Sequence, residues 1–334
     1  MSFGSRFRVC IVLGAILVCG CGIVELGSAA EDRRVRFSTA VLIRVDSSGL
    51  GDYEKIQDAI DVVPANNNQL YFIWVKPGIY SEQVVVPADK PYITLSGTQA
   101  STTILTWNEG GDIFESPTLT VLASHFVARY VTIQNTYRGR AVALRVAGDK
   151  AAFYSCRILS YQDTILDDFG SHYFKNCYIE GATDFICGSG SSLYERCHLH
   201  VVIKEKGIIT AHRRQSESED TGFTFLGCKI TGIDSNSTYL GRPWGPYSRV
   251  IFAYTYMSSA VLPEGWDDWN NFTRRSTVYY GEYKNFGPGS DKSKRVAWSQ
   301  TLSDLEVKPF MSKNKIGGRG WLRPSPKHFI TSKN

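Results

Sequence analysis

FYSCRI (153–158), FKNCYI (174–179), YERCHL (194–199) and FLGCKI (225–230) repeat one pattern: an aromatic residue, a cysteine three positions later, and an aliphatic residue two positions after that. Each copy reads as a short β-strand with alternating apolar residues, followed by polar turns. The cysteines are 21, 20 and 31 residues apart. A period near twenty is too short for a βαβ unit of roughly 30 residues and fits one coil of a solenoid. We therefore predict an all-β fold, a right-handed parallel β-helix, because a β-sandwich would not explain the recurring cysteine position.

The flanking segments predict how the solenoid is closed and interrupted. Residues 55–64 form an amphipathic helix that caps its open N-terminal end. Residues 300–312 contain a short helix with Ser303 as N-cap and Glu306 at the capping-box position. The longer third interval is expected to hold a polar loop, residues 205–220, that bulges from one coil. No linker-like stretch is present, so residues 31–334 are interpreted as one domain.

The N-terminus has the pattern of a secretory signal peptide. Arg6 and Arg8 precede an apolar run, and small residues at 28–30 suit cleavage before Glu31, which removes residues 1–30. The alternative, a membrane anchor, is disfavoured because the apolar run is shorter than the roughly 20 residues that span a bilayer. The net charge of +5 is small and dispersed, which does not indicate a nucleic-acid partner. Five cysteines remain after processing, so at least one thiol is unpaired.

Two aspartates occupy the same position in successive repeats. Asp163 lies seven residues after Cys156, and Asp184 lies seven residues after Cys177. Equivalent positions on neighbouring coils are about 4.8 Å apart, so the two carboxylates are expected to face each other. Such a pair titrates as a unit, with one pKa raised and the other group ionised, which suits an acid/base and a nucleophile. The alternative is that Asp163 and Asp184 only cap turns. We interpret the neighbouring Asp167 and Asp168 in that way, as solvated turn residues.

Polar and aromatic residues near this pair suggest a site for an ester and a sugar. Gln162 precedes Asp163 and can donate an amide N–H to a developing oxyanion. In the LGRPW segment (240–244), Arg242 can hold a carboxylate in its charged form and Trp244 can stack on a sugar face. Taken alone, such a segment is more often a packed surface loop.

Other candidate features are weaker. His198 and His200 alternate along a strand and share a face, which permits metal binding, although no zinc-finger spacing accompanies them. Asn236 and Asn271 begin N-x-Thr sequons, which are glycosylation sites in a secreted protein.

With these residues identified, the chain resembles the plant-type pectin methylesterases (pectinesterases). The matching blocks occur in family order: GIYSEQV (78–84), AVALR (141–145), YQDT (161–164), DFICG (184–188), LGRPW (240–244) and YYGEYKNFGPG (279–289). The resemblance implies a parallel β-helix, hydrolysis of the methyl esters of polygalacturonate, secretion to the cell wall, and no cofactor or metal. It also implies pectin as the substrate and proteinaceous pectinesterase inhibitors as partners. No inhibitor-like pro-domain fits between the signal and the start of the match.

The resemblance assigns roles by position. It implies that Asp184 is the nucleophile and Asp163 the proton donor and acceptor, with Gln162 stabilising the anionic intermediate. It further implies that Arg242 orients the nucleophile, that Trp244 contacts the substrate, and that Cys177 and Cys197 form a disulfide between adjacent coils.

Three positions depart from the family pattern. Arg140 stands where the family has Gln, and we interpret it as a substrate-binding residue. The fixed charge and length of arginine would alter how the intermediate and a substrate carboxylate are bound. Leu166 replaces a Tyr and Cys187 replaces a Phe, so aromatic surface is lost. Two other functions therefore stay open: a catalytically weakened pectin-binding homologue, and another β-helix enzyme, a polygalacturonase or pectate lyase.

Overall fold

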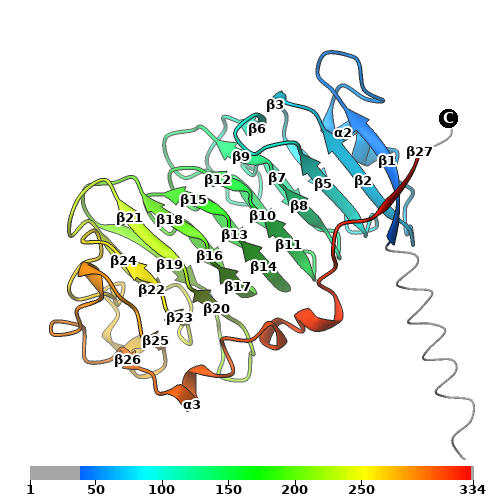
Figure 1. Cartoon of the computed structure of the whole chain (residues 1–334). Coiled ribbons are helices and arrows are strands. Elements are labelled where there is room, and N and C mark those ends of the chain that lie inside the picture. The colour runs from blue at the N-terminus through cyan, green and yellow to red at the C-terminus, as the bar shows by residue number, and fades with distance from the viewer. Residues whose placement is uncertain (1–37, 332–334) are drawn as a thin grey trace, which may run out of the picture.

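The computed structural model describes residues 38–331 as a solenoid of parallel strands, as the repeats predict (Figure 1). Three sheets run along its length, and the strands paired within each sheet belong to successive coils. The predicted signal segment, residues 1–30, lies outside the described residues. Within residues 38–331, no helix has the length and apolarity needed to cross a membrane.

The strands of each sheet follow in spatial order. The twelve-stranded sheet contains β26 (Gln300–Thr301), β25 (Tyr279–Tyr283), β23 (Arg249–Ala253), β20 (Gly222–Leu226), β17 (Ser191–Glu195), β14 (Ser171–Lys175), β11 (Ala151–Tyr154), β8 (Val127–Arg129), β5 (Ile93–Gly97), β2 (Leu70–Val75), β1 (Thr39–Val45) and β27 (His328–Thr331). The eight-stranded sheet contains β24 (Tyr256–Met257), β21 (Lys229–Gly232), β18 (His198–Val201), β15 (Tyr178–Gly181), β12 (Arg157–Leu159), β9 (Thr132–Asn135), β6 (Thr103–Trp107) and β3 (Gly78–Ser81). The seven-stranded sheet contains β22 (Thr238–Pro243), β19 (Gly207–His212), β16 (Ile186–Gly188), β13 (Ile165–Asp167), β10 (Leu144–Val146), β7 (Leu119–Val121) and β4 (Val84–Val86).

The aromatic residue of each repeat becomes one layer of an internal stack. The rings of Phe153 and Phe174 lie 4.8 Å apart, those of Phe174 and Tyr194 4.5 Å, and those of Tyr194 and Phe225 4.7 Å, all nearly parallel. These spacings equal the distance between neighbouring strands, because each ring rises from the same position of its coil. The repeat seen in the sequence is therefore the periodicity of the core.

The repeated cysteines form a second internal column, but the disulfide implied by the resemblance is not formed in the structure. Cys177 and Cys197 are buried free thiols, as are the other three cysteines of the described chain. The Cys177 thiol lies 3.5 Å from the carbonyl oxygen of Phe153, and the Cys197 thiol 3.5 Å from that of Phe174. Each thiol thus donates to the backbone of the preceding coil.

The coils turn at residues with left-handed backbone. The residue before each repeated cysteine has a positive φ: Ser155 (53°), Asn176 (53°), Arg196 (55°) and Gly227 (61°). Only glycine adopts this region without cost, and asparagine and aspartate tolerate it better than most residues. The solenoid therefore accepts a local backbone penalty at each corner, which the packed core must offset.

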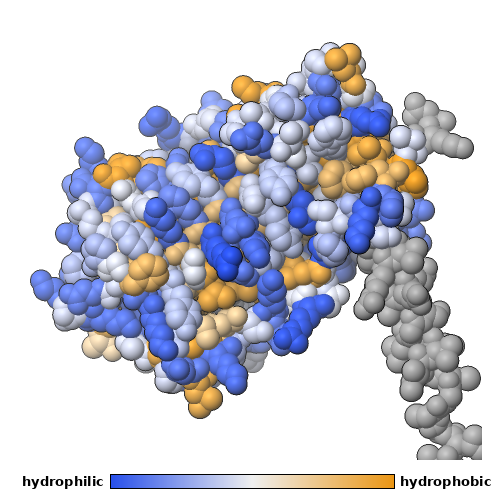
Figure 2. Space-filling model, in the orientation of Figure 1, coloured by the Kyte–Doolittle hydropathy of each residue, from blue (hydrophilic) through white to orange (hydrophobic). Residues whose placement is uncertain are grey.

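Both ends of the solenoid are closed by short elements. The predicted N-terminal helix is present as α2 (Ile56–Asp61), with Ile56, Ala59 and Ile60 buried. The C-terminal segment runs back along the molecule, and β27 pairs with β1 at the N-terminal end (Figure 1). Figure 2 shows apolar surface at this end. Phe329 and Ile330 of β27 are half-exposed.

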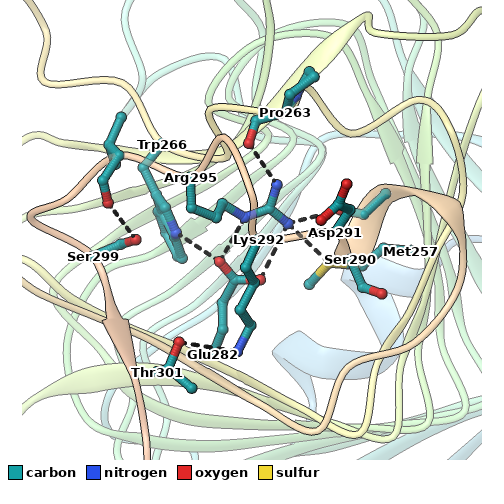
Figure 3. A network of polar contacts seen from close by, with 12 residues as sticks. Met257, Pro263, Trp266, Glu282, Ser290, Asp291, Lys292, Arg295, Ser299 and Thr301 are labelled. Carbon is teal, nitrogen blue, oxygen red and sulfur yellow. Dashed lines mark hydrogen bonds and ion pairs between the residues drawn. The ribbon is translucent and has the colours of Figure 1, made fainter.

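The C-terminal end is held by a buried ion pair. The Arg295 guanidinium contacts both oxygens of Glu282 at 2.8 and 3.2 Å, and it also donates to the carbonyl oxygen of Pro263 at 2.9 Å (Figure 3). The Trp266 indole N–H donates to the same carboxylate at 3.3 Å. Burying this pair is tolerated because both partners are hydrogen-bonded on several sides.

The remaining helices are short and lie near the C-terminus. They are α3 (Asp304–Val307), η1 (Phe272–Ser276), η2 (Pro288–Ser290), η3 (Lys313–Ile316) and η4 (Gly318–Gly320). The predicted capping box of α3 is confirmed, since Ser303 and Glu306 bond reciprocally. The prediction of one polar loop at 205–220 was wrong, because β19 occupies residues 207–212. The Gly207–His212 run is less polar than its surroundings and pairs with β16 and β22.

Candidate active site

Asp163 and Asp184 lie at equivalent corners of adjacent coils, just before β13 and β16. Their φ angles are 61° and 48°, so both side chains leave the backbone from left-handed residues. The Asp163 N–H donates to the carbonyl oxygen of Thr183 at 3.1 Å, and Gln162 and Thr183 form a parallel bridge. One strand spacing therefore separates the two positions.

Burial and mutual repulsion divide the two carboxyl groups chemically. Asp163 and Asp184 are only 8% and 6% exposed. Burial, and then the neighbouring Asp184 charge, raise the pKa of Asp163 to about 7, while Arg140 and Arg242 act in the opposite direction. Burial also raises the pKa of Asp184, but Arg242 counteracts it. At mildly acidic pH this arrangement keeps a proton on Asp163 beside a carboxylate that has its own cation.

Arg242 holds Asp184 in a two-pronged ion pair. Its Nε and Nη2 donate to the two Asp184 oxygens at 2.8 and 2.5 Å. Arg242 lies in β22, two coils beyond Asp184, and its guanidinium is 3.7 Å from the ring centre of Trp269. The two parallel hydrogen bonds fix the orientation of the carboxylate as well as its charge. The contact with Trp269 was not anticipated from the sequence.

Gln162 and Arg140 lie side by side next to Asp163. They form a parallel bridge, so Arg140 occupies the Gln162 position of the preceding coil. The Arg140 side chain is exposed, and its Nε donates to the carbonyl oxygen of Gly111 at 2.8 Å. Two hydrogen-bond donors, one neutral and one charged, thus border the carboxyl pair.

The outer face of the seven-stranded sheet carries a short apolar row between these polar groups. Leu166, Cys187 and Ala211 are in register on consecutive coils, and Arg242 follows them. Together with Val142, the three form a cluster separate from the main core, on which Trp244 packs. Ala211 therefore lies between Cys187 and Arg242 in this row. Burial and the nearby aspartates raise the pKa of the Cys187 thiol, which disfavours a reactive thiolate.

The interpretation of Asp167 and Asp168 as solvated turn residues was wrong. Asp167 is fully buried, and its oxygens contact His172 Nδ1 at 2.6 Å and the Tyr194 hydroxyl at 2.7 Å. Asp168 is 1% exposed and lies against Arg145 and Arg213, at 3.1 and 3.5 Å. Tyr194 lies on a different coil from Asp167, and Arg145 and Arg213 lie on different coils from Asp168. The local sequence does not indicate these contacts.

The remaining predicted sites fall elsewhere. His198 and His200 both contact the Thr231 hydroxyl, at 2.8 and 2.7 Å. Within residues 38–331, no cluster of three or more potential metal ligands is found. Asn236 is exposed, whereas the Asn271 side chain caps η1 by accepting from the Thr273 N–H.

A surface hollow of about 370 Å³ adjoins the corner that carries Gln162 and Asp163, on the side of the eight-stranded sheet. Tyr137 and Tyr161 line it, and Tyr161 directly precedes Gln162. Its other walls include Arg138 and Glu180. The aromatic and polar lining has the character of a carbohydrate-contacting surface.

Comparison with known proteins assigns the chain to a family. The family model described as Pectinesterase matches residues 42–319. The chain is 66% identical over 299 residues to "Putative pectinesterase 11" of Arabidopsis thaliana, covering 88% of this chain and 84% of the relative. It is 42% identical to "Pectinesterase 31" of the same plant, over 85% of this chain and 96% of that protein. The solved structure "Pectin methylesterase from Carrot" superposes with a TM-score of 0.80 at 33% identity, covering 84% of this chain and 94% of that one. The chain belongs to the pectinesterase family.

Proposed function

We propose that this protein hydrolyses the methyl esters of pectin, with Asp184 as nucleophile and Asp163 as general acid and base. The observation that carries the proposal is the pair of buried carboxyl groups on adjacent coils, one with a pKa near 7 and the other bound by Arg242. Family membership supports the reaction, and the row of donors and apolar groups supports a polymeric ester as substrate.

In the first step, an Asp184 oxygen attacks the C6 carbonyl carbon of a methyl-esterified galacturonate unit. Negative charge develops on the carbonyl oxygen, where the Gln162 amide donates a hydrogen bond and Arg140 adds a positive charge. Collapse of the tetrahedral intermediate breaks the bond to the methoxy oxygen, which takes the proton of Asp163 and leaves as methanol. An acyl anhydride with Asp184 remains.

In the second step, the ionised Asp163 accepts a proton from a water molecule that attacks the anhydride at C6. The bond to Asp184 breaks, so the galacturonate leaves as a free acid and both aspartates return to their starting states. The net reaction consumes one water and produces one methanol and one carboxylic acid.

The test is product analysis with methyl-esterified polygalacturonate. We expect methanol release without new reducing ends and without unsaturated products. Chain cleavage without methanol would instead identify a polygalacturonase or pectate lyase. Binding to pectin without either product would identify a non-catalytic homologue.

Arg140 makes a specific prediction about pH. Its charge lowers the pKa of Asp163, so Arg140→Gln should raise that pKa and keep Asp163 protonated to higher pH. Because the first step needs the proton, kcat/KM of the wild type should fall as pH rises through about 7. The variant should show this fall at higher pH. The measurement is a pH profile of methanol release, with Arg138→Gln as a control for charge alone; equal shifts in both variants would contradict the assignment.

The site of action is proposed on two grounds. The N-terminal sequence has the features of a secretory signal, and pectin is a polymer of the plant cell wall. We therefore expect a secreted protein in the wall, with inhibitor proteins as further partners. Immunodetection in wall fractions of the producing tissue tests the location.

A further inference from the structure

The outward face of the eight-stranded sheet carries a row of basic and aromatic side chains, one from each of five successive coils. Arg157, Tyr178, His198, Lys229 and Tyr256 are in register on β12, β15, β18, β21 and β24 (Figure 1). The residue that follows each of them is apolar and fully buried, so these five side chains point outward. Four strand spacings separate the first from the last, so the row is about 19 Å long. We call this row the basic ridge.

The basic ridge is separate from the catalytic corner. Tyr178 begins β15, whereas Asp184 lies beyond the end of that strand. A second outward row of the same sheet, which contains Glu180 and His200 in register, lies between the two. Glu180 of this second row lines the hollow beside the catalytic corner. A ligand on the basic ridge therefore lies outside the site where the ester is cleaved.

The positive charges of the basic ridge are not neutralised by ion pairs. Within residues 38–331, neither Arg157 nor Lys229 forms an ion pair with an acidic side chain. Glu180 of the neighbouring row accepts the Tyr178 hydroxyl at 2.7 Å. Burial lowers the pKa of His198, and the charges of Lys229 and Arg157 lower it further. The ridge thus has a positive potential, which attracts an anionic partner.

Aromatic rings lie between these charges. The Arg157 guanidinium is 4.4 Å from the ring centre of Tyr178, and the Tyr178 ring is 5.1 Å from that of His198. Tyr256 at the far end contacts the exposed Phe286 of the next coil, with ring centres 5.6 Å apart. Such rings offer an apolar face with a polar edge, which suits the face of a sugar. Cations and rings repeated along one line match a polymer whose units each carry a sugar ring and a carboxylate.

We propose that the basic ridge is a second, non-catalytic binding site for an acidic polysaccharide, unesterified polygalacturonate. Carboxylates of the chain pair with Arg157 and Lys229, and its sugar rings lie against Tyr178 and Tyr256. The choice of polymer rests on the proposed function, because unesterified polygalacturonate is the product of that reaction. Binding to the ridge itself requires no catalysis. The ridge then holds the enzyme on stretches of pectin that are already de-esterified.

The experiment measures the affinity for unesterified polygalacturonate by calorimetry at low ionic strength. The double variant Arg157→Gln/Lys229→Gln should bind about tenfold more weakly than the wild type, because two charge-assisted contacts are lost. The difference should shrink as salt is added, since salt screens exposed charges. The catalytic groove is the same in both proteins, so its contribution cancels and the difference reports the ridge.

A second double variant controls for net charge. Lys55→Gln/Lys308→Gln removes the same charge from two exposed positions outside the sheets and should keep the wild-type affinity. The charge-conserving variant Arg157→Lys/Lys229→Arg should retain most of the affinity. Equal weakening in the ridge and control variants, or wild-type affinity in a folded ridge variant, would overturn the second site. Absence of methanol release by the wild type, with the affinity difference intact, would overturn only the proposed reaction.

Discussion

Replacing Asp184 by Asn is expected to lower kcat for methanol release by at least about 10⁴-fold, because the amide cannot form the acyl intermediate. Asn is the right substitution because residue 184 has a φ of 48°, a region that Asn tolerates and Ala does not. Loss of activity in the Asn variant then reports chemistry and not a distorted corner. The neutral side chain leaves Arg242 without its partner charge, so circular dichroism and thermal unfolding must accompany the kinetics.

Covalent catalysis gives Asp184 a second readout. With hydroxylamine present, the wild type should form a galacturonate hydroxamate in an enzyme-dependent reaction, since hydroxylamine captures the C6 acyl group from the anhydride. The Asp184→Asn variant should form none, whereas Asp89→Asn, at an exposed position far along the chain, should match the wild type. Wild-type turnover in Asp184→Asn would remove the nucleophile from the proposal.

Replacing Asp163 by Asn is expected to lower kcat by roughly 10² to 10⁴-fold, the usual contribution of a positioned acid and base. The residue has a φ of 61°, so Asn again fits the corner. The rate of methanol release by the wild type should fall above about pH 7 as Asp163 loses its proton. The rate of the Asp163→Asn variant should not fall in this pH range. A residual activity that still falls near pH 7 would assign that titration to another group.

Measurements of the free energy of unfolding distinguish a loss of catalysis in Asp163→Asn from a loss of folded protein. A carboxyl pKa raised to about 7 in the folded protein means that the fold resists ionisation of Asp163. The unfolded chain loses this proton near pH 4, so wild-type stability should decline as pH rises from about 4 to about 7. The Asn variant should escape this decline and be at least as stable as the wild type at pH 7. Lower stability there would show that the carboxyl group supports the fold.

Much of the site was predictable because solenoid geometry converts sequence spacing into distance. The seven-residue offset from Cys156 and Cys177 placed Asp163 and Asp184 on adjacent coils without any coordinates. From the sequence Arg242 was only a candidate partner, because its 58-residue separation from Asp184 does not show that the two side chains meet across two coils. Trp269 was not predicted as a site residue, because it lies outside the repeats and its position in the sequence does not relate it to a coil.

The repeat alone determined the coil, its aromatic core and the alignment of the two aspartates, because each depends only on residues recurring at one interval. Tertiary structure decided which polar partners the buried aspartates have: His172 of the same coil and Tyr194 of the next one for Asp167, and Arg145 and Arg213 of other coils for Asp168. It also left the cysteine column as free thiols. These outcomes depend on side-chain direction and on burial at contacts between coils, which spacing along the chain does not encode.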